Sequence, residues 1–197
     1  MKNLTIVAVL GVAASLITTP ASASLHVTPG NAIASGGGGS SNNFVETAAA
    51  LFLSTYPGST ITNQAQLQAA ELYRLTPPAS DDKTLKDSYE GSTSALPGDD
   101  TSAFEINYTS GPSIDPTYML IKDGNHTPSW YLFDISAWDG ISELSGSGFW
   151  ENTNGGISHI SIYGTVAAAV PEPATIAVWS ILAVAATFAA TKRANVA

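Results

Sequence analysis

The chain has 197 residues and a formal net charge of −9 at pH 7, with 7 Lys and Arg against 16 Asp and Glu. A surface this acidic repels nucleic acids, so nucleic-acid binding is excluded. The absence of cysteine excludes disulfides, cysteine-ligated metals, cysteine nucleophiles and a lipid-modified cysteine. Without the two terminal segments described below, roughly 145 residues remain, which is enough for one domain with a single core.

The first 23 residues have the three parts of a secretory signal peptide. Lys2 supplies the positive charge, residues 4–17 are apolar, and Ala21 and Ala23 stand at the two small-residue positions before a cleavage site. We expect export by the Sec translocon and cleavage by signal peptidase between Ala23 and Ser24. A membrane helix is the alternative, but the apolar stretch is too short to span a bilayer.

The next part of the chain predicts a leader and two helices. Residues 24–43 contain four consecutive glycines and predict a flexible leader, since glycine is entropically costly to order. Residues 44–56 and 64–75 have apolar side chains at helical spacing and predict short helices. Residues 79–101 are polar and rich in turn formers, which predicts a long surface loop with room for one short strand.

The rest of the domain has the period of two that is typical of half-buried strands. Turn residues, among them Asp115-Pro116, separate these stretches. We predict a mainly β, antiparallel sandwich-like domain over residues 44–169, with the helical region against it or over one end. The expected strands are residues 104–108, 118–122, 130–135, 144–150, 157–163 and, as a last strand or a tether, 165–170.

Residues 170–197 form a tail that ends the chain. Residues 174–191 carry no charge over eighteen positions, which is near the lower limit for a transmembrane helix. Lys192 and Arg193 follow directly and would stay in the cytoplasm by the positive-inside rule. The domain would then lie outside the inner membrane.

Pro171-Glu172-Pro173 precedes this apolar span, and the two prolines favour an extended approach to it. The motif, the span, the basic pair and the N-terminal signal together resemble the PEP-CTERM sorting signal of Gram-negative bacteria. The resemblance implies that a membrane-embedded exosortase recognises Pro171, Glu172 and Pro173 and cleaves nearby, after which the protein moves toward the cell surface or the exopolysaccharide matrix. A permanent C-terminal anchor is the alternative.

Two further resemblances concern the domain and the tail. Residues 118–125, 128–134, 138–140, 148–150 and 157–164 are similar to a β-rich domain that recurs on proteins with this tail and has no assigned activity. This implies a shared β fold and no substrate. The same tail occurs on some ice-binding proteins, but no regular Thr-x-Thr pattern is present here.

Neither catalysis nor a resident metal is indicated. His26, His126 and His159 lack metal-site spacing, and no Gly-x-Ser-x-Gly motif marks a nucleophile. Oxygen ligands for Ca²⁺ could come from Asp and Asn residues, but their spacing does not match an EF-hand loop, and turn chemistry explains them as well. No cofactor is therefore expected, with Ca²⁺ left open. The residues in question are Asp123, Asn125, Asp134 and Asp139.

Aromatic residues are concentrated in the second half of the domain. They suit stacking on sugars if they are exposed, and a sandwich core if they are buried. Trp138 and Trp150, which lie next to turns, are the candidates for contact with exopolysaccharide. The leading hypothesis is a non-enzymatic, exported surface or matrix protein, anchored for a time in the inner membrane; the second is a carbohydrate-binding module, and the third is a secreted hydrolase.

Overall fold

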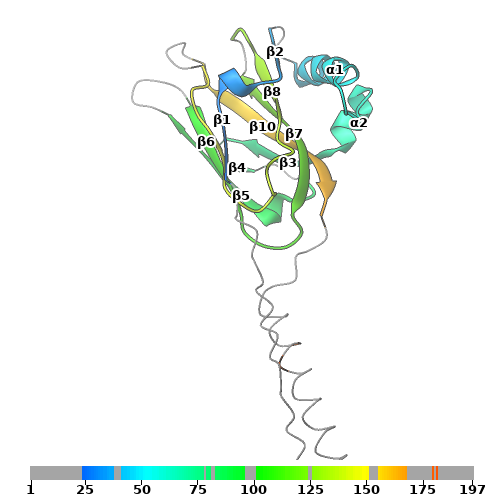
Figure 1. Ribbon diagram of the computed structural model, residues 1–197. Helices are drawn as coiled ribbons and strands as arrows, with labels where there is room; N and C mark the ends of the chain where they lie inside the picture. Colours follow the sequence, from blue (N-terminus) through cyan, green and yellow to red (C-terminus); the bar gives the residue numbers. More distant parts are fainter. Residues whose placement is uncertain are drawn as a thin grey trace, which may run out of the picture.

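The structure is a computed structural model that describes residues 24–37, 41–77, 79–80, 83–95, 101–123, 126–150 and 155–167, together with Trp179 and Ile181. These residues form two packed sheets, and two helices lie on the outer side of the larger sheet (Figure 1). The prediction of a mainly β fold is confirmed.

The smaller sheet has four strands in the order β1-β9-β6-β5, and the larger has six in the order β2-β8-β7-β10-β3-β4. Neighbouring strands are antiparallel except for β1 and β9, which are parallel. The elements in chain order are β1 (Leu25–Val27), η1 (Pro29–Asn31), β2 (Ala34–Gly36), α1 (Asn42–Leu53), α2 (Gln64–Ala69), β3 (Glu71–Thr76), β4 (Ala79–Ser80), η2 (Lys86–Ser88), β5 (Tyr89–Ala95), β6 (Thr101–Tyr108), β7 (Ile114–Asp123), β8 (Trp130–Asp134), β9 (Leu144–Gly146) and β10 (Ile157–Val166).

The larger sheet is covered on both faces. In β8, Phe133 points to the core between the two sheets, whereas Trp130 and Leu132 point to the core beneath the helices. In β7, Met119 points to the core between the sheets and Leu120 to the core beneath the helices. Because successive side chains of a strand point to opposite faces, strands covered on both sides become almost continuously apolar.

The helix α1 is held on the sheet by one apolar face and by buried charges. Val45, Ala49 and Leu53 are buried at helical spacing, as expected for an amphipathic helix. Glu46 accepts a hydrogen bond of 2.5 Å from the Gln68 side chain of α2 and lies 3.5 Å from the Arg74 guanidinium of β3. These contacts tie both helices to the sheet.

Glu71 at the start of β3 is also buried, with a side chain 2% exposed. Its two carboxylate oxygens lie 2.6 Å from Arg74 Nε and 2.7 Å from Lys83 Nζ. Burial raises the pKa of Glu71, but the hydrogen bonds from Lys83 and Arg74 outweigh it, so the net effect is a lowered pKa. The carboxylate is therefore buried as a paired anion.

The prediction of a flexible leader is wrong for residues 24–37. β1 pairs with β9 and β2 pairs with β8, so the domain begins near residue 24 instead of residue 44. A Cβ on Gly36 would lie 2.6 Å from Cζ2 of Trp130. The first glycine of the run therefore allows close packing on an indole ring, whereas sequence analysis interpreted it as a source of flexibility.

The second predicted helix is half right. It ends at Ala69, and residues 71–76 form β3 with Tyr73 and Leu75 buried in the core between the sheets. Apolar residues at these positions fit both helical and strand spacing, and pairing with β10 decides in favour of the strand. The predicted loop 79–101 also contains β5, whose outward residues Glu90, Ser92 and Ser94 are exposed.

Asp115-Pro116 does not form a turn but lies within β7. The pairing of β7 with β10 shifts register between Tyr163 and Gly164, opposite this dipeptide. A Cβ on Gly164 would lie 2.2 Å from the Asp115 carbonyl oxygen. The irregularity admits a proline that regular ladder pairing would disfavour.

The predicted signal peptide, residues 1–23, lies outside the described residues, and so does the predicted membrane span apart from Trp179 and Ile181. Both of these are helical and 68% exposed. Among the described residues, no helix is long and apolar enough to cross a membrane.

Candidate functional site

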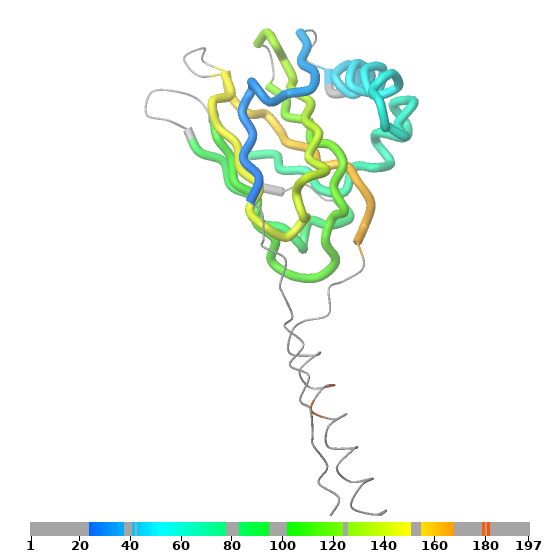
Figure 2. Tube along the Cα trace, in the orientation of Figure 1, coloured from blue at the N-terminus to red at the C-terminus, as the bar shows by residue number. Residues whose placement is uncertain are grey.

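Both ends of the described domain emerge at the same end of the molecule (Figures 1 and 2). Leu25 donates its backbone N–H to the Glu143 carbonyl oxygen at 3.0 Å, and Ala167 donates to the Ser113 carbonyl oxygen at 2.9 Å. We call this end the exit pole and define it as residues 86–88, 109–115 and 139–143. The first and last strands are thus fixed to two loops of one surface.

Tyr89, the first residue of β5, joins these loops. Its hydroxyl donates to the Gly140 carbonyl oxygen at 2.7 Å and accepts from the Ile114 N–H at 2.7 Å. Burial raises the pKa of Tyr89 to about 12. The hydroxyl therefore remains protonated, and able to donate, throughout the physiological pH range.

The loop 139–143 approaches β7 so closely that residue 140 must be glycine. Gly140 has a φ of 74°, and a Cβ there would lie 2.0 Å from the Ile114 carbonyl oxygen. Both the left-handed backbone and the lack of space exclude other side chains. This contact fixes the loop that receives the N–H of Leu25.

Asp139 is used within its own loop. Its carboxylate accepts hydrogen bonds from the N–H groups of Ile141 and Ser142 at 2.9 and 2.7 Å, and from the Ser142 hydroxyl at 2.5 Å. Burial raises the pKa of Asp139, but these bonds outweigh it and lower the pKa overall. Turn chemistry thus explains this residue, as sequence analysis allowed.

The remaining acids of the exit pole face solvent. Asp87, Asp115 and Glu143 are exposed, and Lys86 is the one basic residue in the three segments that define the pole. Two apolar side chains are exposed close by, Ile141 at 40% and Val166 at 49%. Sequence analysis did not single out these acids, because no local pattern marks a surface acid as lying beside a chain exit.

Of the predicted processing residues, Ser24 is described and lies exposed directly before β1. Ala21 and Ala23 lie outside the described residues, as do Pro171, Glu172, Pro173, Lys192 and Arg193. Only residues 168–170 separate Ala167 from the Pro-Glu-Pro motif in the sequence. Both predicted processing sites are therefore only a few residues along the chain from Leu25 and Ala167, which are hydrogen-bonded to the exit pole.

The two tryptophans proposed as sugar contacts are core residues. Trp138 is 2% exposed and donates its Nε1–H to the Ser142 carbonyl oxygen at 2.8 Å. Trp150 is 6% exposed and donates to the Pro128 carbonyl oxygen at 2.6 Å. Neither ring has a free face for stacking on a sugar, so the prediction of glycan contacts at these residues is wrong.

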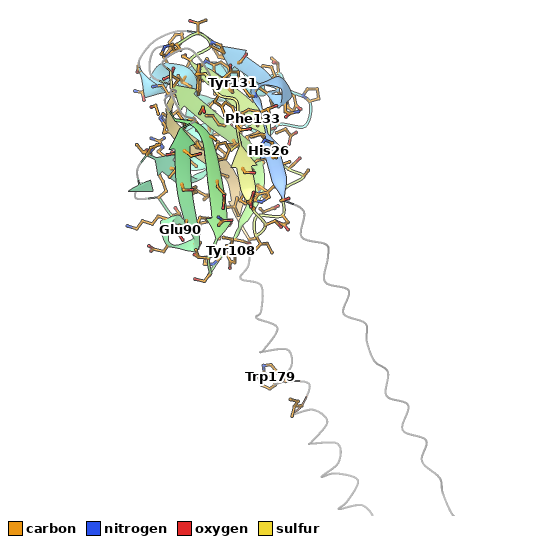
Figure 3. The ribbon with its side chains drawn as sticks, turned by 90° about the vertical axis from the view of Figure 1, so that its left-hand side faces the viewer. His26, Glu90, Tyr108, Tyr131, Phe133 and Trp179 are labelled. Atoms are coloured by element: carbon orange, nitrogen blue, oxygen red, sulfur yellow. The ribbon has the colours of Figure 1, made fainter. Side chains whose placement is uncertain are left out.

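His26 and His126 each lie beside a different part of a hydrolytic triad. On the outer face of the four-stranded sheet (Figure 3), His26 lies 3.2 Å from the hydroxyls of both Ser145 and Ser147, and no carboxylate is hydrogen-bonded to it within the described part of the chain. In the β7–β8 loop, His126 Nδ1 lies 2.5 Å from Asp123 Oδ2, its one hydrogen-bond partner among the described residues. Neither imidazole joins a hydroxyl to a carboxylate, which a serine hydrolase requires.

The acids considered for Ca²⁺ are also separated. Asp123 ends β7, whereas Asp134 ends β8 opposite Tyr118, so the two lie toward opposite ends of the same strand pair. Asn125 is outside the described residues. Within the described ranges no group of three or more His, Asp or Glu side chains could hold a metal ion.

Comparisons with protein-family models, with curated proteins and with solved structures found no match to this chain.

Proposed function

We propose that this chain is an exported, non-enzymatic protein of a Gram-negative bacterium, held for a time in the inner membrane by residues 174–191. In this proposal an exosortase recognises Pro171, Glu172 and Pro173 and removes the tail. The mature domain is then released to the cell surface or the extracellular matrix. Sec translocon and signal peptidase act on the N-terminal segment.

The observation that carries this proposal is the shared exit of the two chain ends. Because both ends of the described domain leave from one pole, a domain tethered by its tail would turn that pole toward the membrane from which it was exported. Leu25 and Ala167 are hydrogen-bonded to loops of the same pole, and the acidic outer surface suits a domain outside the cell. The sequence of the tail supports the same assignment.

The carbohydrate-binding hypothesis has lost the two residues on which it rested, and the hydrolase hypothesis had no assigned catalytic residues. A carbohydrate-binding module was inferred from Trp138 and Trp150, which are buried. A hydrolase needs a nucleophile and base in one place, whereas His26 and His126 each have only part of that arrangement. We therefore carry neither of them forward.

Cell fractionation of a motif variant tests the proposal. The change of Pro171, Glu172 and Pro173 to Ala, Gln and Ala should keep the protein in the inner-membrane fraction with its tail attached, whereas the unchanged protein leaves that fraction. Asn195→Ala, which lies beyond the basic pair, is the matched control and should behave like the unchanged chain. Equal release of the motif variant would argue for an ordinary anchor or an unrelated export route.

A further inference from the structure

The short connection between the domain and the tail limits where the domain can lie. The hydrogen bond from Ala167 to Ser113 ends the described domain, and Pro171 follows after residues 168–170. Since an extended chain spans at most about 3.6 Å per residue, Ala167 lies no more than about 14 Å from Pro171. A protein that binds the motif on the folded chain must therefore lie within that distance of Ala167, which is hydrogen-bonded to Ser113 of the exit pole.

The surface at that position has the features of an interface. Ile141 and Val166 are exposed apolar residues, and the exposed acids Asp87, Asp115 and Glu143 lie in or beside the same loops. Exposed apolar side chains together with exposed charged ones are the usual composition of a protein contact surface. The acids would be repelled by anionic lipid headgroups and attracted by a basic protein surface.

We propose that the exit pole is the docking surface for the membrane-embedded enzyme that processes the tail, and that this enzyme presents a basic extracytoplasmic surface to it. This inference rests on the proposed function, because it needs an enzyme that binds residues 171–173. Docking brings Pro171 into reach at high effective concentration, since the motif is tethered to the bound pole. Recognition then involves the folded domain as well as the tail.

Charge reversal in the full-length chain tests this. In Asp87→Lys/Glu143→Lys, the exit pole should repel the basic surface of the enzyme instead of attracting it. Conversion of the precursor to its tail-free form, measured by pulse-chase labelling in cells, should then slow by about tenfold. The matched control is Glu105→Lys/Ser92→Lys/Ser94→Lys, which changes the net charge by the same amount on exposed positions of β5 and β6. The control should convert at the unchanged rate.

Insertion of a spacer distinguishes loss of docking from damage to the fold as the cause of slow conversion. Insertion of a flexible Gly/Ser segment of about 20 residues between Ala167 and Ala168 moves the pole beyond contact range. In the charge-reversed chain this insertion should restore conversion, because the repulsive surface no longer faces the enzyme. Continued slow conversion after insertion, or an unchanged rate without it, would overturn the inference.

Two other outcomes have distinct meanings. Faster conversion on charge reversal would show that the pole faces anionic lipid, and it would also overturn the proposed protein contact. If the unchanged chain keeps its tail in every strain, the proposed function itself fails. If the unchanged chain is processed and the variants are processed equally, only the docking surface is wrong.

Discussion

Ala167 donates its backbone N–H to the carbonyl oxygen of Ser113 at 2.9 Å, and this hydrogen bond holds the end of β10 against the β6–β7 loop. Gly111 in that loop has a φ of 91° and accepts a hydrogen bond from the Tyr108 hydroxyl; Figure 3 shows Tyr108 at this end of the domain. The chain therefore leaves a well-fixed surface, and the predicted processing motif begins soon after it.

Gly140→Ala should be among the most destabilising glycine-to-alanine substitutions in the domain. The new Cβ meets the Ile114 carbonyl oxygen at 2.0 Å, in addition to the left-handed strain at a φ of 74°. Gly58→Ala is the matched control, because its φ is 86° and nothing lies within 4 Å of its Cβ. Urea unfolding should show a loss of about 1–2 kcal/mol for the control and a clearly larger loss for Gly140→Ala. Equal losses would mean that the loop moves freely.

Tyr89→Phe should destabilise the domain at neutral pH, because the N–H of Ile114 and the carbonyl of Gly140 lose their partner. We expect a loss of about 1–3 kcal/mol in the free energy of unfolding. The exposed hydrogen bond of Tyr108 provides the control, and Tyr108→Phe should cost less.

The loss of stability caused by Tyr89→Phe should also depend on pH. The pKa of Tyr89 is about 12 in the folded state against 10.0 for the free group, so the folded state retains the proton longer. The stabilisation by this hydroxyl is complete below pH 10 and is lost as the pH rises toward 12. The difference between wild type and Tyr89→Phe should therefore shrink over that range. A difference that stays constant from pH 9 to 12 would contradict the buried environment of this residue.

Glu71→Gln should cost about 3 kcal/mol, because it leaves Arg74 and Lys83 without their buried anion. Since the folded-state pKa of Glu71 lies below its ordinary value of 4.5, its stabilisation is present above that pH and is lost as the pH falls further. Glu90→Gln, at an exposed position, should change stability by no more than about 0.5 kcal/mol. Denaturant titrations at pH 7 and pH 3 measure both effects, and the cost of Glu71→Gln should be smaller at pH 3.

Removal of residues 24–40 should lower the stability of the domain strongly. It takes away β1 and β2, exposing the packing surfaces of β9 and β8 that Val27 and Gly36 cover. The test compares the thermal unfolding midpoints of two chains, one that begins at Ser24 and one that begins at Ser41. Both chains end at Ala167. Similar midpoints would restore the interpretation of these residues as a dispensable leader.

The regions that sequence analysis predicted well have one clear local pattern. The alternation at residues 104–108 and 130–135 places Phe104 and Ile106 in one core and divides β8 between the two faces of its sheet. Helix α1 also follows from its local apolar spacing.

Other features depend on contacts between distant residues. The glycine run looked flexible because the ring of Trp130, which requires Gly36, lies far along the chain. Trp138 and Trp150 looked accessible because they lie next to turns in the sequence, but their rings are buried and donate to the carbonyl oxygens of Ser142 and Pro128. The exit pole could not be predicted, since it arises from the strand order that brings Leu25 and Ala167 to the same end of the domain.

The intact mass of the mature protein tests the central claim most directly. Protein recovered from the surface or medium of a strain with an active exosortase should begin at Ser24 and should lack the apolar span and the basic pair, Lys192-Arg193. In a strain without the enzyme the chain should begin at the same residue and retain its whole tail. An identical C-terminus in the two strains, whether intact or shortened, would contradict processing by an exosortase.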